Sequence, residues 1–122
     1  HGEKREMAGV IAADVVMHEK PVGRGYVRLA PTTAHPWLPP GSHPDEIPAH
    51  EFHYSSLENL DPATRFAYEV KRGHGADGAH DGIVHKNLLA SYTHLRSAGN
   101  CNWAARFAGF ARQRKLLPIP TP

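Results

Sequence analysis

Six of the eleven prolines fall between Pro31 and Pro48, and this cluster divides the chain into two structured parts. Proline has no backbone N–H donor and a fixed φ, so a stretch this rich in proline does not continue a helix or a central strand. We therefore expect residues 31–48 to form a loop. Loops of this length in compact domains are usually functional or mobile. Trp37, inside the loop, is expected either to pack back onto the domain or to line a binding surface.

Short apolar and alternating segments on both sides of the loop predict a strand-rich chain. The apolar run 7–17 predicts one buried strand or two short ones, residues 21–25 a turn, and residues 26–29 a strand. After the loop, residues 51–55, 66–70 and 83–94 have strand patterns. The glycine-rich segment 73–82 predicts a hairpin connection between the last two.

The clearest helix is expected near the C-terminal end, at about residues 101–115. Trp103, Phe107 and Phe110 form an apolar stripe at helical spacing together with two alanines. Asn100 or Asn102 can cap the helix. Basic residues fall in its last turn, where they complement the helix dipole, and prolines follow it.

Size and charge limit the classes of function. The 122 residues make one domain, 1–122, or part of one, and the net charge of +2 gives no reason to expect nucleic-acid binding. No apolar run reaches the roughly 18 residues that span a bilayer. The single cysteine, Cys101, suits a reducing cytoplasm. The polar N-terminus has no signal-peptide pattern and no initiator Met, so we expect the chain to begin inside a longer gene product or after a cleaved tag.

Two groupings of residues could carry chemistry without any family information. His50 and His53 resemble part of a zinc motif, but on a strand their side chains point to opposite sides, so we expect no metal site there. Cys101 and His94 could form a thiol–imidazole pair. The bulky Trp103 two residues after Cys101 does not suit a nucleophile elbow, so a part-buried structural cysteine is favoured.

A series of motifs over most of the chain resembles the C-terminal half of the class I glutamine amidotransferase domain in the cobyrinic acid a,c-diamide synthase family. Relatives proposed to amidate sirohaem share the resemblance. The motifs are Met7-x-Gly9-Val10, Met17-His18, Gly23-Arg24-Gly25-Tyr26, His50-Glu51-Phe52-His53-Tyr54-Ser55, Arg72-Gly73-x-Gly75, Asp81-Gly82, Asn87, Ala90-Ser91-Tyr92-x-His94 and the helix around Trp103.

The resemblance implies an α/β fold of flavodoxin-like layout, strand-rich here and with a C-terminal helix. It implies an enzyme with two parts. An N-terminal domain, using ATP and Mg, activates a tetrapyrrole carboxylate, and the amidotransferase domain hydrolyses glutamine to supply ammonia. No P-loop motif occurs in the 122 residues. The resemblance therefore places the ATP site, and the nucleophilic cysteine upstream of Met7, outside this chain, which alone is expected to be inactive and to need no cofactor.

The resemblance also assigns roles to residues. His94 matches the catalytic histidine, and Glu51 is a candidate for orienting it from a neighbouring strand. His53, Tyr54 and Ser55 match a strand end that contacts the glutamine backbone. Arg96 stands where the diamide synthases often have a second histidine, which leaves the particular tetrapyrrole open.

Three hypotheses follow. The first is a fragment of a glutamine-dependent tetrapyrrole amidase that carries the catalytic His94. The second is a non-catalytic, amidotransferase-like module that binds a partner or a ligand. The third is a free-standing enzyme using Cys101 and His94. For the fragment, the expected partners are the missing amidotransferase half or the synthase domain, and a homodimer is an alternative, because half of a domain leaves a sheet edge unpaired.

Overall fold

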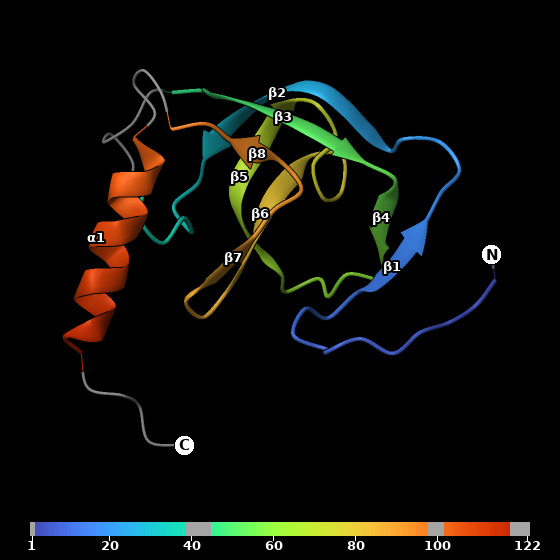
Figure 1. Cartoon of the computed structure of the whole chain (residues 1–122), viewed down its shortest axis with the longest axis horizontal. Helices are drawn as coiled ribbons and strands as arrows, with labels where there is room; N and C mark the ends of the chain where they lie inside the picture. The colour runs from blue at the N-terminus through green and yellow to red at the C-terminus, as the bar shows by residue number, and fades with distance from the viewer. Residues whose placement is uncertain (1, 39–44, 98–101, 118–122) are drawn as a thin grey trace.

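The computed structural model shows a strand-rich chain with a C-terminal helix, as the sequence predicts (Figure 1). It describes residues 2–38, 45–97 and 102–117. Within these ranges the elements are β1 Asp14–Met17, β2 Gly23–Pro31, β3 Ile47–His53, β4 Ser55–Glu58, β5 Arg65–Arg72, β6 His80–His85, β7 Leu88–Ala90, β8 His94–Leu95 and α1 Trp103–Lys115.

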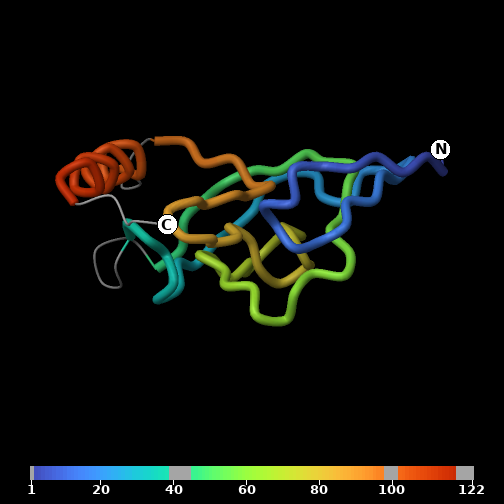
Figure 2. The backbone as a smooth tube through the Cα atoms, turned by 90° about the horizontal axis from the view of Figure 1, so that it is seen from below, coloured from blue at the N-terminus to red at the C-terminus, as the bar shows by residue number. Residues whose placement is uncertain are grey.

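Six of the strands form one antiparallel sheet in the order β7-β6-β5-β2-β3-β8. The long central pair β2–β3 runs in register from Gly23 opposite His53 to Leu29 opposite Ile47. In the view of Figure 2 the sheet is curled, and α1 lies at the end away from the N-terminus. The core is formed mainly by β2, β3 and β5, and its buried residues are Val27, Leu29, Leu38, Ile47, Ala49, Ala67 and Tyr68.

Strand β3 alternates strictly between buried and exposed side chains. Its inner face carries two apolar residues, Ile47 and Ala49, and then two polar ones, Glu51 and His53. His50 is exposed and His53 is buried, so the prediction that they point to opposite sides is confirmed. The inner face of one strand thus passes from apolar core to a buried polar cluster.

The first apolar run differs from its prediction of a buried strand. Only Asp14–Met17 is extended, and all four of its side chains are exposed. The reason is its partner: β1 pairs with the four-residue β4 in a separate two-stranded sheet. Such a ribbon has no second layer of its own to bury an apolar face. The turn predicted at 21–25 is also shorter than expected, because β2 already begins at Gly23.

The proline-rich segment is irregular between its ends, as far as the structure describes it, while Pro31 and Pro48 belong to β2 and β3. Trp37 packs against α1, with its ring centroid 5.1 Å from that of Phe107 and 5.7 Å from that of Phe110. Of the predicted apolar stripe on α1, only Phe110 is fully buried. Residues 98–101, which include Asn100 and Cys101, lie outside the described ranges; the helix there begins at Trp103. Among the helical residues described, none forms a helix long and apolar enough to cross a membrane.

Candidate functional site

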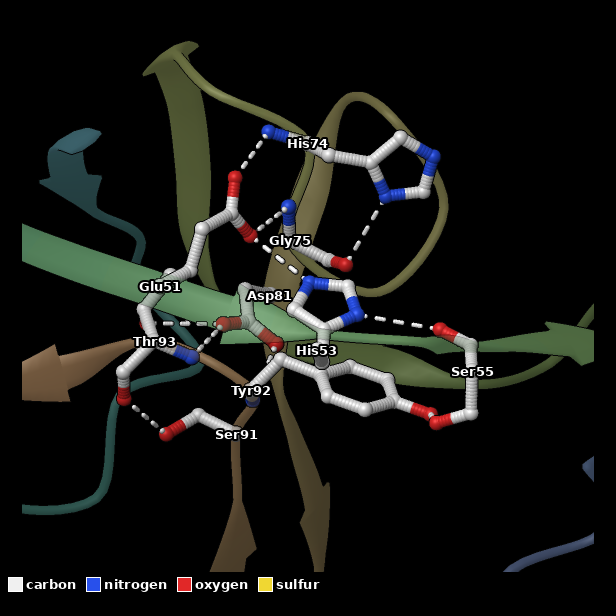
Figure 3. Close-up of polar contacts among 9 residues, drawn as sticks. All are labelled: Glu51, His53, Ser55, His74, Gly75, Asp81, Ser91, Tyr92 and Thr93. Atoms are coloured by element: carbon white, nitrogen blue, oxygen red, sulfur yellow. Dashed lines mark hydrogen bonds and ion pairs between the residues drawn. The ribbon is translucent and has the colours of Figure 1, made fainter. Parts of the chain in front are cut away.

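A buried carboxylate–imidazole pair lies at the polar end of β3 (Figure 3). Glu51 Oε2 is 2.9 Å from His53 Nε2, and the two side chains are only 2% and 8% exposed. The other ring nitrogen, Nδ1, lies 3.0 Å from the carbonyl oxygen of Ser55. Both ring nitrogens therefore have a hydrogen-bonding partner inside the protein.

The glycine-rich turn after β5 supplies the remaining contacts of the Glu51 carboxylate. The backbone N–H of His74 donates to Oε1 at 2.7 Å, and that of Gly75 donates to Oε2 at 2.9 Å. Burial alone raises the pKa of Glu51, but the hydrogen bonds from His74, His53 and Gly75 outweigh it and leave this pKa lowered. The carboxylate is thus held in its charged form.

Two glycines make this close packing feasible. A Cβ at Gly23 would collide with the His53 imidazole and the Glu51 carboxylate. Gly75 has a φ of +68°, in the left-handed region that residues with a side chain rarely adopt. Glycine at these positions lets two backbone segments approach the pair directly.

The aromatic ring of Tyr92 connects the pair to the segment that precedes β8. It stacks on the His53 imidazole with ring centroids 4.0 Å apart and an interplanar angle of 19°. Its hydroxyl lies 2.7 Å from Oγ of Ser55. The side chains of His53 and Ser55 are therefore linked to the residues immediately before His94.

A second buried carboxylate, Asp81 of β6, holds the same segment. The backbone N–H groups of Tyr92 and Thr93 donate to Asp81 at 3.2 and 2.9 Å, and the Thr93 hydroxyl donates at 2.7 Å. Figure 3 shows the Asp81 carboxylate beside the backbone of this segment. Asp81 is 0% exposed, so these three donors replace the water it would otherwise bind.

His94 lies on the other, exposed face of the sheet. It is registered opposite His50 of β3, and the two rings have centroids 5.0 Å apart. It also lines an open, mainly apolar pocket of about 310 Å³ that reaches to α1. The pocket's other lining residues are Trp37, Tyr68, Leu89, Ser91, Thr93, Leu95, Trp103 and Phe107.

The structure brings some of the predicted site residues together and separates others. His53 and Ser55 belong to one network with Glu51, whereas Tyr54 is exposed and packs against Phe52. The structure does not bring Glu51 and His94 together. Directly paired residues of antiparallel strands share a face, so His94 shares the face of His50, and Glu51, the next residue of β3, points the opposite way.

The positions of His53 and His94 suit two different roles. The imidazole of His53 is buried with both nitrogens occupied, which suits a structural role. The side chain of His94 is exposed on the face that it shares with His50, where a reacting group can reach it, and His94 is one of the residues that line the pocket. Among the described residues, no group of three or more His, Cys, Asp or Glu side chains could hold a metal ion. Cys101 lies outside the described residues, so the structure does not place it relative to His94.

Three contributors to the site received no role in the sequence analysis: Asp81, Tyr92 and Thr93. Asp81 stands in the glycine-rich segment 73–82, and the signal that could have identified it is its place two residues before Ile83, since a strand that began earlier would put both side chains on one face. Charged residues are almost never fully buried unless they have partners. Serine, tyrosine and threonine just before His94 are donors that such a carboxylate can use.

Comparison with known proteins gives a consistent result. Residues 1–100 match the family model described as a CobB/CobQ-like glutamine amidotransferase domain. A cobyrinate a,c-diamide synthase of Magnetococcus marinus is 45% identical over 119 residues, which is 98% of this chain and 25% of the relative. The synthase of Halobacterium salinarum is 40% identical over 77% of this chain and 20% of the relative. That of Archaeoglobus fulgidus is 33% identical over 90% of this chain and 23% of the relative. No solved structure matches the chain significantly.

Proposed function

The chain belongs to the CobB/CobQ-like glutamine amidotransferase family, and we propose that it is the histidine-bearing part of a glutamine-dependent, ATP-driven amidase of tetrapyrrole carboxylates. The family has a flavodoxin-like α/β layout, of which the described strands and helix form part. The chain spans only 20–25% of the length of these curated relatives, so the complete activity requires further sequence. The observation that carries the proposal is the exposed side chain of His94, a residue that also lines the pocket beside α1.

In the proposed reaction His94 moves a proton. A cysteine thiol outside this chain gives its proton to His94, and the thiolate attacks the amide carbon of glutamine. The proton then passes from His94 to the departing nitrogen, which leaves as ammonia, and water hydrolyses the thioester to glutamate. A base placed in this way typically contributes about 100-fold to 10,000-fold in rate.

The ammonia is proposed to react with a carboxylate that another domain has activated with ATP and Mg. No P-loop motif occurs in this sequence, so the residues at hand do not fit a nucleotide site, and we assign it to the complete enzyme. The partners proposed for the chain are therefore the remainder of that enzyme, glutamine and a tetrapyrrole carboxylate. The cobyrinate of the relatives is the first substrate to test.

For glutamine itself, we propose that the segment from His53 to Ser55 lies close to the ligand. The exposed ring of Tyr54 is the part of this segment that remains accessible. His53 and Ser55 support it through their contacts with Glu51 and Tyr92. Glu51 acts on this support and not on the His94 ring, because it faces the opposite side of β3.

The test compares two nitrogen sources in the complete enzyme. His94→Ala is expected to remove glutamine-dependent amidation and to leave ammonia-dependent amidation, because free ammonia bypasses the thiol chemistry. His85→Ala is the matched control: His85 is another exposed strand histidine, at the end of β6. It is expected to change neither activity.

An unchanged ratio of the two activities in His94→Ala would exclude His94 from the mechanism and favour a non-catalytic binding module. The 122-residue chain alone is expected to release no glutamate from glutamine. Release that disappears in Cys101→Ser would instead support a free-standing thiol enzyme.

A further inference from the structure

The segment that carries His94 has few strand pairs to fix its position. Strand β8 has two residues at the edge of the six-stranded sheet, and its described ladder consists of two pairs, Ala49 with Leu95 and His50 with His94. The His94 side chain is exposed, and its ring contact is with His50, which is exposed as well. A catalytic base must nevertheless be held within about 0.5 Å of its working position.

Asp81 supplies an anchor from inside the protein. Its carboxylate accepts three hydrogen bonds, and all three come from the two residues immediately before His94. A fully buried carboxylate is costly to place in a core, and charge-assisted hydrogen bonds are roughly twice as strong as neutral ones. The segment and the carboxylate are therefore bound to each other strongly, and movement of Thr93 would leave a buried charge short of donors.

The ring of Tyr92 adds a second attachment in the same segment. It stacks on His53 and its hydroxyl contacts Ser55, so the end of β3 and the start of β4 hold the side chain while Asp81 holds the backbone (Figure 3). One attachment acts through the side chain of Tyr92 and the other through its backbone N–H. Together they restrict both the position and the rotation of the segment that leads into His94.

We infer that Asp81 is a positioning residue for His94: its bonds to Tyr92 and Thr93 set where the imidazole stands relative to the thiol and glutamine. The inference rests on the proposed role of His94. Misplacement of a reacting group by about 1 Å can lower a rate roughly 100-fold. Weakening the Asp81–Thr93 contact should therefore lower glutamine hydrolysis without affecting the use of free ammonia.

The experiment uses the complete enzyme and weakens the contact between Asp81 and Thr93 to different degrees. Asp81→Asn replaces one acceptor oxygen by an NH₂ group that faces donors. Thr93→Val removes only the hydroxyl, and Thr93→Ser keeps it. We expect the ratio of glutamine-dependent to ammonia-dependent rates to fall about 10- to 100-fold in Asp81→Asn and Thr93→Val. Thr93→Ser should restore it to near the wild-type ratio.

Two further measurements separate positioning from general stability. Leu29→Val thins the core on β2, away from this segment, and is expected to leave the ratio unchanged. Hydrogen–deuterium exchange of the complete enzyme should show faster exchange of the peptide covering residues 92–95 in Thr93→Val and not in Leu29→Val.

The outcomes distinguish the inference from the proposed function. If His94→Ala lowers the ratio and Thr93→Val does not, the positioning role of Asp81 is wrong whatever the exchange shows. Equal loss of both activities in Thr93→Val would also overturn it, because a structural role alone predicts that result. If His94→Ala leaves the ratio unchanged, the proposed function fails and the inference fails with it. Should Asp81→Asn not fold, the Thr93 pair decides alone.

Discussion

The carboxylate of Glu51 and the imidazole of His53 form a buried pair, 2.9 Å apart, although the two residues are only two positions apart on one strand. Side chains at i and i+2 of a strand share a face, so the strand itself brings them together. The N–H groups of His74 and Gly75 complete the shell of the carboxylate from a different hairpin. The pair therefore joins β3 to the turn between β5 and β6.

Removing the charge of this pair should destabilise the chain. Glu51→Gln places an NH₂ group where, among the described residues, the His53 ring and the N–H groups of His74 and Gly75 surround the carboxylate, so at least one of them loses its acceptor. Hydrogen bonds to charged groups contribute about 1.5–3 kcal/mol, and we expect a loss in that range. Urea unfolding at pH 7 measures it. Glu69→Gln, at an exposed position of β5, is the control and should change the free energy of unfolding by less than about 0.5 kcal/mol.

The same pair predicts a dependence of stability on acid. The pKa of Glu51 is lowered in the folded chain, with hydrogen bonds from His74, His53 and Gly75 outweighing burial. A lowered folded-state pKa means that the contribution is complete above the usual value of about 4.5 and is lost as pH falls through the folded value. Urea unfolding between pH 6 and pH 3 should show the wild-type chain losing its advantage over Glu51→Gln as the pH falls below the usual value. A constant difference over this range would contradict the assignment.

Local patterns in the sequence predicted those elements that depend only on neighbouring residues of the same strand or hairpin. The strand pattern at 66–70 and the glycine-rich connection at 73–82 depend on neighbours within a strand or a hairpin, and both are present in the structure. The prediction of a buried strand in the run 7–17 was wrong because apolar composition does not show which layer covers a strand. Val15 and Val16 are 43% and 40% exposed, since β1 pairs with the short β4.

The candidate site shows the same division. That His50 and His53 face opposite sides followed from the strand period alone. The Asp81–Thr93 contact depends on how β6, β7 and the following turn fold back, and no local period encodes it. The separation of Glu51 from His94 likewise depends on which residue of β3 lies opposite His94 in the register.

Substitution at Gly75 should be more damaging than at its neighbour in the same turn. A Cβ at Gly75 would lie 2.7 Å from the backbone oxygen of His80, and the residue has a φ of +68°. Gly78 also has a positive φ, +90°, but the nearest atom to its added Cβ is 4.0 Å away. Both alanine variants carry the strain of about 1–2 kcal/mol for a left-handed residue. Only Gly75→Ala adds a backbone collision and displaces a donor to Glu51. Chemical denaturation that ranks Gly78→Ala as the less stable variant would refute this account.

Gly109→Ala should stabilise the helix. Gly109 lies in the interior of α1, and an added Cβ meets nothing within 4 Å among the atoms described. Alanine is favoured over glycine inside a helix by about 0.8–1.0 kcal/mol. Slower hydrogen exchange of the α1 amides is the expected readout. The opposite substitution at the neighbouring position, Ala108→Gly, should speed amide hydrogen exchange. The change in free energy should be of similar size and opposite sign, since Ala108 is exposed.

Trp37 should determine whether α1 stays packed against the rest of the described chain. Its ring contacts Phe107 and Phe110 of the helix and His35 of its own loop, and each aromatic pair contributes about 0.5–1.5 kcal/mol beyond burial. Its indole Nε1 is buried and has no hydrogen-bond partner among the described residues. Phenylalanine at position 37 therefore removes an unpaired donor while keeping a ring in place.

Trp37→Ala should detach the helix. Amide exchange in α1 should become fast while β2, β3 and β5 keep their protection, and the emission of Trp103, the second of the chain's two tryptophans, should shift to the red. Trp37→Phe should keep α1 protected. If Trp37→Ala left the exchange of α1 unchanged, the helix would be held by contacts other than these rings.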